Sequence, residues 1–283
     1  MRVVQLPDAT AFLDATHAFR SANVALTNLL GSIATAVVEG RRYADQTWLA
    51  IEDEDGVVGC AIRTAPWPLA VSPMPLEGAR ALGQVLRDLD PDLPGIVGPL
   101  TVVHGIADSM GREASIAVAE LVRVLGDYVK PGSVPGQARV ATTSDLPLAR
   151  EWWGRFAADI GQPLRDIAGL PDQLEQMFAD ERLVLWEVRG EPVAMAGHAV
   201  LVVTAQGAVG RIGPVFTPEE QRRQGFGAAV TGAVVERLQS RCEVIMLFTD
   251  AANRTSNGVY ERLGFEPVAE VVEAELRVAH EAS

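Results

Sequence analysis

The stretch that decides the fold of this chain is Arg222-Arg223-Gln224-Gly225-Phe226-Gly227. The apolar run Ile212–Phe216 before it predicts a strand, and the apolar residues of 228–238 recur at helical spacing and predict a helix after it. Because Gly225 and Gly227 carry no side chain, a phosphate can approach the N–H groups and the positive end of the dipole of that helix. The two arginines add charged donors. The alternative interpretation is a strand-to-helix turn with two convenient glycines.

Two familiar phosphate loops are excluded by spacing. No Gly-Lys-Ser/Thr ending is present, so the stretch is not a P-loop. The order Gly225-x-Gly227-x-x-Val230 lacks the third glycine of the dinucleotide fingerprint. A nucleotide-dependent dehydrogenase is therefore disfavoured.

A second informative block follows in the same half of the chain. The run Glu243–Asp250 is continuously apolar and closes on polar residues, which predicts a buried strand. Residues 251–265 come next and predict a short helix. Asp250 or Asn253 can cap that helix, and Gly264 can end it with a positive φ.

Both blocks resemble the GNAT superfamily of acyl-CoA-dependent N-acyltransferases. The first matches the pyrophosphate-binding signature R-x-x-G-x-G, and the lead-in Val215–Pro218 resembles the central strand of that family and its exit. The second resembles N-x-x-S/N-x-x-x-Y-x-x-x-G-F, here carried by Asn253, Ser256, Asn257, Tyr260, Gly264 and Phe265. The resemblance implies an α/β (α+β) fold with a mixed central sheet flanked by helices, and acetyl-CoA as co-substrate.

The resemblance also implies site residues. Family members bind pyrophosphate at the Arg/Gly loop, use the Asn on the pantetheine arm and place the Tyr hydroxyl near the CoA sulfur. Tyr260 is thus the candidate catalytic acid, with packing beside Val259 and Leu263 as its alternative, and Asn253 has helix capping as its alternative. The predicted cofactor-binding residues are Val215, Phe216, Thr217, Arg222, Arg223, Gln224, Gly225, Phe226, Gly227, Ala228, Asn253 and Ser256.

Two loop positions depart from the family pattern. Arg223 stands where glycine is frequent, and Gln224 replaces the usual Arg or Lys before Gly225. Both residues still offer backbone and side-chain donors, so the departures leave the expected CoA site in place.

The chemistry of N-acylation fits several of these residues. Pro214 has no N–H and would disrupt the sheet, which could free the N–H of Val215 or Phe216 for the thioester carbonyl or the pantetheine amides. An unperturbed phenol has a pKa of about 10, so Tyr260 can donate to a departing thiolate.

The general base is not assignable from the sequence. The segment 209–216 contains no Asp or Glu. Glu187, His198 and Asp250 are the nearest alternatives by topology, and each has a structural explanation: a surface position, a core histidine and a helix cap. A water relay needs none of them.

A Pro- and Gly-rich linker, residues 131–137, divides the chain into two predicted domains. Residues 138–283 form the catalytic GNAT domain. Residues 1–130 repeat part of its order but contain neither motif, so we expect a degenerate GNAT-like domain without a CoA site, with a plain accessory α+β domain as the alternative. A tandem GNAT-like architecture follows.

The element order supports this division. In the first half we expect helices over 9–20, 26–39 and 76–89, a hairpin of 48–52 with 57–62, a strand over 95–98, and one or two helices over 106–128. In the second half we expect a strand over 138–142, helices from 143 and over 171–180, a hairpin of 183–188 with 193–197 whose second strand continues to 204, and a strand over 209–216. The loop between those two helices and the cleft between the domains are expected to select the acceptor, whose identity the sequence does not give.

Composition bounds the function. The 283 residues carry a net charge of −13, which repels nucleic acid and anionic lipid. No apolar run approaches a membrane span, and two cysteines fit a reducing cytoplasm. Lys130 is the one lysine, and the Arg-, Ala-, Gly- and Val-rich composition is typical of a bacterial genome of high GC content. The histidines show no metal-ligand spacing, so no metal is expected.

These observations predict a bacterial, cytoplasmic acyltransferase, either monomer or homodimer. It would transfer an acetyl group from acetyl-CoA to the primary amine of a small-molecule or amino-acid-like acceptor by direct attack. The alternative is a CoA-binding sensor or pseudoenzyme whose first half binds a regulatory partner.

Overall fold

The computed structural model describes residues 1–161 and 169–278. Residues 162–168 of the expected acceptor loop lie outside the described residues. Two compact units are present: unit 1 holds Met1–Val122, Thr204–Gln206 and Val268–Ser283, and unit 2 holds Arg123–Val203 and Gly207–Pro267. The boundary between these units lies at residues 122–123, whereas the predicted domains meet at the linker 131–137. The predicted domain boundaries therefore remain a prediction. In the described ranges, no helix is long and apolar enough to cross a bilayer.

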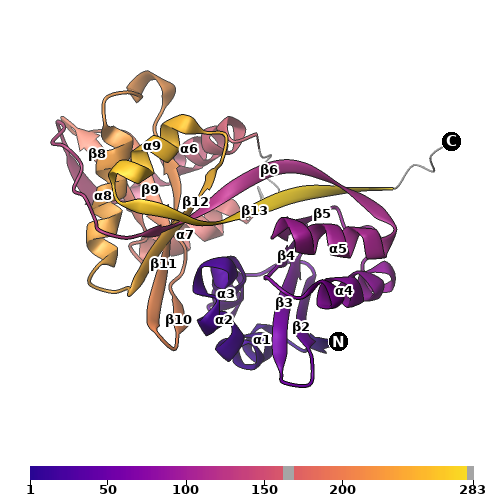
Figure 1. Cartoon of the computed structure of the whole chain (residues 1–283). Helices are drawn as coiled ribbons and strands as arrows, with labels where there is room; N and C mark the ends of the chain where they lie inside the picture. Colours follow the sequence, from indigo (N-terminus) through magenta and orange to yellow (C-terminus); the bar gives the residue numbers. More distant parts are fainter. Residues whose placement is uncertain (162–168, 279–283) are drawn as a thin grey trace. The chain divides into compact units, whose positions relative to one another are not determined.

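Unit 1 is a mixed sheet with helices on both faces (Figure 1). Its strand order is β1-β2-β3-β4-β5-β13-β6, where β4 and β5 are parallel. The strands are β1 (Arg2–Leu6), β2 (Gln46–Glu52), β3 (Val57–Thr64), β4 (Leu69–Val71), β5 (Gly95–Gly98) and parts of β6 (Arg112–Leu125) and β13 (Phe265–Val278). The helices are α1 (Ala9–Ala15), α2 (His17–Ala22), α3 (Val24–Val38), α4 (Leu76–Leu89) and α5 (Leu100–Met110).

Strand alternation divides the core of unit 1 into two layers. Trp48 and Cys60 face α1 and α3, whereas their neighbours Leu49 and Ala61 face α4 and α5. Such apolar residues on both faces of the central strands are expected when helices cover both sides of a sheet.

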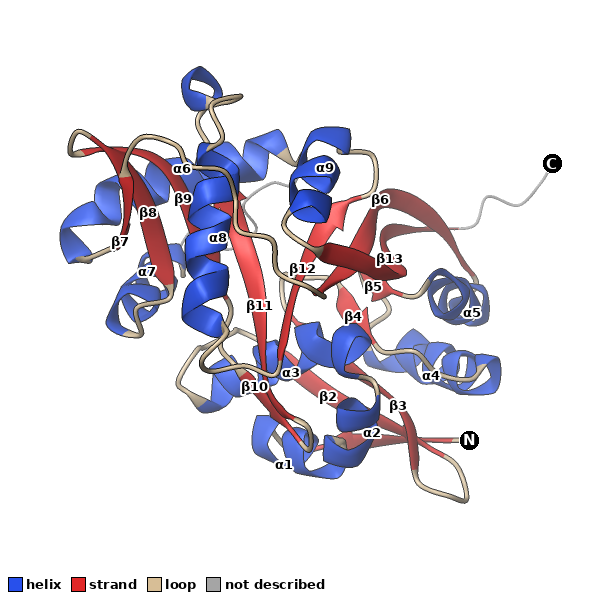
Figure 2. Ribbon diagram, turned by 60° about the vertical axis from the view of Figure 1, so that its left-hand side comes forward, coloured by secondary structure: helices blue, strands red, loops and turns tan. Residues whose placement is uncertain are grey.

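Unit 2 repeats this design with different helices (Figure 2). Its strand order is β13-β6-β12-β11-β9-β8-β7, and β10 pairs with β11. The strands are β7 (Gln137–Val140), β8 (Leu183–Val188), β9 (Glu191–His198), β10 (Val202–Thr204), β11 (Gly207–Phe216) and β12 (Val244–Asp250). Helices α8 (Phe226–Leu238) and α9 (Arg254–Arg262) pack on one face, and α6 (Leu146–Asp159) and α7 (Leu170–Ala179) on the other.

Most expected elements are confirmed, two differ, and the strands β1, β4 and β13 were not expected. The helix expected over 106–128 is wrong beyond Met110, because Gly111 adopts φ +71° and ends α5, after which the chain forms β6. The strand expected to run to Thr204 ends at His198 and resumes as β10. The long terminal strand β13 was not anticipated; it pairs with β5 through Val272↔Gly98 to Glu275↔Gly95.

The Pro- and Gly-rich segment between β6 and β7 is tied to unit 2. The N–H of Gly126 donates to the carbonyl of Gly264 at 2.9 Å, and that of Val129 to Leu263 at 3.1 Å. The indole of Trp186 donates to the carbonyl of Pro135 at 2.9 Å. The segment therefore packs as part of the unit rather than as a free tether.

This packing makes Gly136 critical for stability. Its φ is +107°, and a Cβ there would lie 2.2 Å from the carbonyl oxygen of Glu187. We expect Gly136→Ala to lower the free energy of unfolding by about 1–3 kcal/mol, as strained backbone does. Urea unfolding followed by tryptophan fluorescence measures the change.

Gly132→Ala is the matched control in the same segment. A Cβ at Gly132 meets nothing within 4 Å, so its unfolding midpoint should stay near that of the native chain. Equal midpoints for the two variants would show that residue 136 is not constrained.

Candidate functional site

The site is built where two neighbouring parallel strands separate. The register of β11 with β12 runs from Val209↔Val244 to Ile212↔Leu247 and ends there. Beyond that point β11 continues beside β9 alone, to Phe216↔Met195. Figure 2 shows β11 and β12 diverging towards their carboxyl ends. The divergence leaves one edge of β11 without a strand partner, as proposed from Pro214.

The separation coincides with a bulge on the other side of β11. The pairing with β9 shifts between Ile212↔His198 and Val215↔Ala196. Gly213 and Pro214 occupy the shift; Gly213 has φ +151°, a value that favours glycine, and Pro214 offers no N–H to either neighbour. The predicted disruption of the sheet at Pro214 is confirmed.

The Arg/Gly loop connects β11 to α8. The short 3₁₀ turn Glu219–Gln221 is followed by Arg223 at φ +64° and by Gly225 at φ +87°, which is the N-cap residue of α8. No side chain caps the helix. The first intrahelical bond joins the N–H of Ala229 to the carbonyl of Gly225, so the N–H groups of residues 226–228 have no intrahelical acceptor.

These uncapped N–H groups fit an anionic ligand. Backbone donors and the positive end of the helix dipole attract phosphate at such a position. A Cβ on Gly227 would lie 3.2 Å from Oγ1 of Thr217, and one on Gly225 would lie 2.8 Å from a methyl of Val134. Larger residues at either position would therefore crowd the loop against its neighbours, and the uncapped N–H groups suit an anion such as a CoA pyrophosphate.

The side chain of Arg222 holds the loop rather than projecting freely. Its Nε donates to the carbonyl of Thr217 at 3.0 Å, and an Nη pairs with the carboxylate of Asp159 on α6. A second ion pair, Arg155 with Glu220 at 3.0 Å, joins α6 to the same loop. Arg223 and Gln224 are exposed.

Phe216 and Phe226, both predicted cofactor contacts, are core residues. Phe216 packs against Trp152, and the guanidinium of Arg155 lies 5.5 Å from the centre of its ring. Phe226 belongs to the core beneath α8. Because both side chains are buried, only the backbone groups of these two residues are available to contact a cofactor.

Helix α9 begins where β12 ends, at the same edge of the sheet. Asn253 is its N-cap: Oδ1 accepts from the N–H of Ser256 at 3.0 Å, which confirms the capping role. Its Nδ2 has no acceptor among the described residues, so capping and ligand binding are compatible. Ser256 contributes its backbone N–H to this cap.

Asn257 received no role from the sequence, although it lies in the second motif. Its Nδ2 donates to the carbonyls of Asp250 at 3.1 Å and Ala251 at 3.3 Å, which fixes α9 to the end of β12. Its Oδ1 is buried without a partner among the described residues. The sequence offered one indication of this role: Asn257 is a polar residue on the face of the predicted helix that also carries apolar, buried positions.

Tyr260 packs against the core, one of its two interpretations, and its catalytic role remains a prediction. Its half-buried ring makes an edge contact with Phe265, with 6.1 Å between the ring centroids, so the residue has a packing role. Its hydroxyl bonds to no residue in the ranges 1–161 and 169–278. Burial raises the pKa of Tyr260 to about 12, because the phenolate would be poorly solvated. The phenol therefore stays protonated and keeps a free donor.

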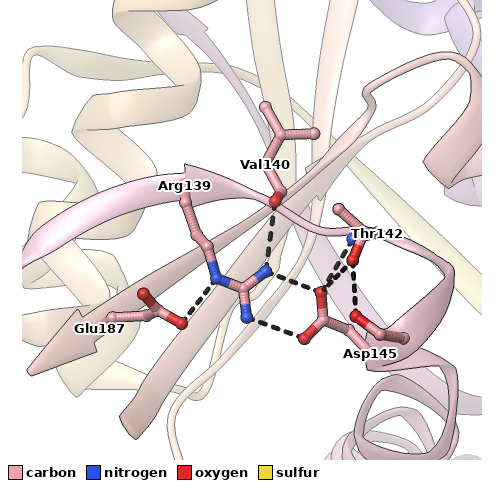
Figure 3. A network of polar contacts seen from close by, with 6 residues as sticks. Arg139, Val140, Thr142, Asp145 and Glu187 are labelled. Carbon is pink, nitrogen blue, oxygen red and sulfur yellow. Dashed lines mark hydrogen bonds and ion pairs between the residues drawn. The ribbon is translucent and has the colours of Figure 1, made fainter. Parts of the chain in front are cut away.

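The three base alternatives are each engaged elsewhere. Figure 3 shows Arg139 between Glu187, whose oxygen lies 2.6 Å from Nε, and Asp145, which it binds in a bidentate pair at 2.7 and 2.8 Å. Nδ1 of His198 donates to the carbonyl of Ala199 at 2.7 Å, and burial lowers its pKa to about 4. Asp250 accepts from the N–H of Ala252 at 2.8 Å. No base is assigned.

Comparisons with known proteins agree with this geometry. Residues 188–274 match the FR47-like protein family. No curated protein sequence matches this chain.

Solved structures resemble the whole chain at low identity. A GNAT-family acetyltransferase from Colwellia psychrerythraea is 12% identical, with coverage of 98% of this chain and 100% of that chain and a TM-score of 0.61. A GCN5-related N-acetyltransferase from Sphaerobacter thermophilus is 15% identical, with coverage of 96% and 95% and a TM-score of 0.59. A tandem GNAT protein from the clavulanic acid biosynthesis pathway is 15% identical, with 99% coverage of both chains and a TM-score of 0.62.

These likenesses extend over both units, so the predicted repeat architecture is confirmed at the level of the fold. The chain therefore has the GNAT fold in a tandem arrangement, and residues 188–274 in its second half match the FR47-like family.

Proposed function

We propose that the chain transfers an acetyl group from acetyl-CoA to the primary amine of a small-molecule or amino-acid-like acceptor by direct attack. One observation carries the proposal. At the end where β11 leaves β12 stand the uncapped N-terminus of α8 and the start of α9, the helix that carries Tyr260 and its free hydroxyl. The GNAT fold supports acetyl transfer as the general chemistry.

Binding of acetyl-CoA is supported by backbone groups of unit 2. The N–H groups of residues 226–228 suit the pyrophosphate. The edge of β11 beyond Ile212 suits the pantetheine amides, which would extend the sheet as a strand does. The free Nδ2 of Asn253 is a further donor.

In the proposed acetyl transfer, one bond forms, one bond breaks and one proton moves. The lone pair of the amine nitrogen forms the new C–N bond at the thioester carbonyl carbon, the C–S bond breaks, and one proton passes from nitrogen to sulfur. An unpaired N–H of β11 beside Val215 or Phe216 stabilises the oxygen that gains negative charge. A neutral amine enters the reaction, because an ammonium has no lone pair.

Tyr260 stabilises the departing sulfur by a hydrogen bond. Its pKa of about 12 lies above the value of about 8.5 for a thiol, so the phenol donates a hydrogen bond and retains its proton on balance. The proton on sulfur arrives from the amine through water, which is consistent with the engagement of Glu187, His198 and Asp250.

A thiol-release assay tests the proposal. The full chain, acetyl-CoA and a panel of small amines and amino acids should yield free CoA in step with an N-acetylated product. CoA binding without release for any amine would favour the CoA-binding sensor instead. Release without acylated amine would indicate hydrolysis.

We expect one CoA site per chain. The single R-x-x-G-x-G loop lies at Arg222–Gly227, and residues 1–130 have no equivalent. Isothermal titration of the full chain with CoA should therefore give a stoichiometry of one. A stoichiometry of two would contradict the expectation that unit 1 has no CoA site.

Gly227→Val should weaken CoA binding by about 10–100-fold, the loss of one or two hydrogen bonds to a charged group. The branched side chain would crowd Oγ1 of Thr217, which lies 3.2 Å from an added Cβ, and would displace the backbone of the first turn. Gly225→Val should act in the same direction and also strain the loop, because its φ is +87°. Isothermal titration measures affinity, and circular dichroism checks the fold.

Gly258→Ala is the control, since it changes a helical glycine of α9 near only the flexible end of Arg262. Its CoA affinity should match that of the native chain. Unchanged affinity in both loop variants would place the pyrophosphate elsewhere.

Tyr260→Phe should lower turnover by roughly 10²–10³-fold and leave acetyl-CoA affinity unchanged, because a positioned donor to developing charge is lost while the ring still packs. Steady-state kinetics with a good acceptor measures this split. The raised pKa keeps the phenol neutral through pH 10, so the native chain should show no falling limb near that pH, where an ordinary tyrosine would ionise.

Tyr128→Phe is the matched control. Its hydroxyl lies 3.4 Å from Gly232 O and from a carboxylate oxygen of Glu236, on the side of α8. Turnover should be preserved in this variant. Native turnover in Tyr260→Phe would leave water as the sole group that stabilises the sulfur.

A further inference from the structure

Arg20, on α2 of unit 1, is a buried charge without a counter-ion. It is 3% exposed, and Arg123 of unit 2 is 1% exposed; they are the two arginines that the described part of the chain buries. The Nη2 of Arg123 lies 2.9 Å from the carboxylate of Glu261. Arg20 has no carboxylate partner within residues 1–161 or 169–278.

The guanidinium of Arg20 is held in a fixed orientation by one edge. Its Nε donates to Oγ1 of Thr16 at 2.9 Å, and its Nη2 donates to the carbonyl of Leu13 at 2.9 Å. Thr16 is itself fixed, because Oγ1 donates to the carbonyl of Phe12 at 2.6 Å. The opposite edge, formed by Nη1 and the second N–H of Nη2, has no acceptor among the described residues.

The nearby thiol of Cys60 does not supply the missing negative charge. Cys60 is fully buried, and its pKa is raised to about 12 mainly by burial, although a hydrogen bond with Ser72 and the charge of Arg20 act in the opposite direction. The thiol is therefore neutral near pH 7. Burial also lowers the pKa of Arg20, yet arginine stays charged in proteins.

Helix α3, which packs beside Arg20, carries buried polar side chains within an otherwise apolar cluster, namely Thr27, Asn28 and Ser32. Oγ1 of Thr27 contacts the carbonyl of Arg20 at 3.2 Å, and Oγ of Ser21 accepts from the N–H of Ala205 at 3.0 Å. An unpaired charge in such a core costs several kcal/mol unless a partner neutralises it.

We propose that unit 1 binds a small carboxylate at Arg20. Two parallel N–H donors on the free guanidinium edge match the two oxygens of a carboxylate, which is the geometry of bidentate Arg–carboxylate pairs. The ligand supplies the counter-ion that the fold lacks. The carboxylate of a free organic acid and that of an amino acid share this chemistry, and the site is separate from the Arg/Gly loop of unit 2.

Thermal unfolding of the full chain at constant ionic strength and pH tests the proposal. Sodium acetate and glycine, each compared with sodium chloride, represent the two sources of carboxylate, and sodium sulfate is the tetrahedral comparison. We expect at least one carboxylate to raise Tm saturably, by about 2–4 °C at roughly ten times its Kd, and sulfate to have less effect. The arm with the larger rise identifies the source.

Arg20→Gln should abolish the carboxylate-specific rise. Arg63→Gln is the matched control in unit 1, because Arg63 is paired with Asp90 at 3.1 Å, and it should keep the full rise. No saturable rise in the native chain would overturn the proposal without reference to any variant. An equal rise with sulfate, or an undiminished rise in folded Arg20→Gln, would overturn it as well.

Discussion

The loss of pairing between β11 and β12 after Ile212 is the constraint on which the candidate site depends. Parallel strands normally continue their hydrogen-bond ladder to the end, and every unpaired buried group costs free energy. Here Gly213 and Pro214 shift the pairing with β9, and the ladder with β12 has already ended at Leu247. The unpaired edge, the N-terminus of α8 and the start of α9 are therefore brought to one side of the sheet by the course of two strands.

The motifs made this side of the sheet predictable from the sequence. Glycines at 225 and 227 and a proline at 214 are backbone signals, and the conformation of the backbone at those positions follows from their chemistry. Asn253 also has the predicted capping bond. By contrast, the partners of Arg222 and Glu187 come from distant parts of the chain, and no local pattern identifies Asp159 or Arg139 as those partners.

The fold was less predictable where local propensity and tertiary pairing disagree. Residues 112–125 are rich in Ala, Glu, Leu and Arg, which favour helix, but Val118, Val122 and Val124 alternate as in a strand. Gly111 ends the preceding helix, and pairing within the sheet then decides the conformation. In strand β13, Glu273 and Glu275 alternate with the buried Val272, Ala274 and Leu276, a period-2 pattern that favours a strand, but its partner β5 lies far away in the sequence.

With a net charge of −13, the chain would need short-range donors to bind the anionic cofactor proposed for it. At physiological ionic strength the field of distant carboxylates is screened within about 8–10 Å, so it affects the rate of encounter more than the stability of the complex. One of the two arginines of the loop, Arg222, is already paired with Asp159. The N–H groups at the start of α8 are not neutralised by an ion pair of this kind, and the helix fixes their orientation. They therefore keep their full attraction for an anion. The proposed binding through backbone dipoles would thus reconcile an acidic protein with a phosphate-bearing ligand.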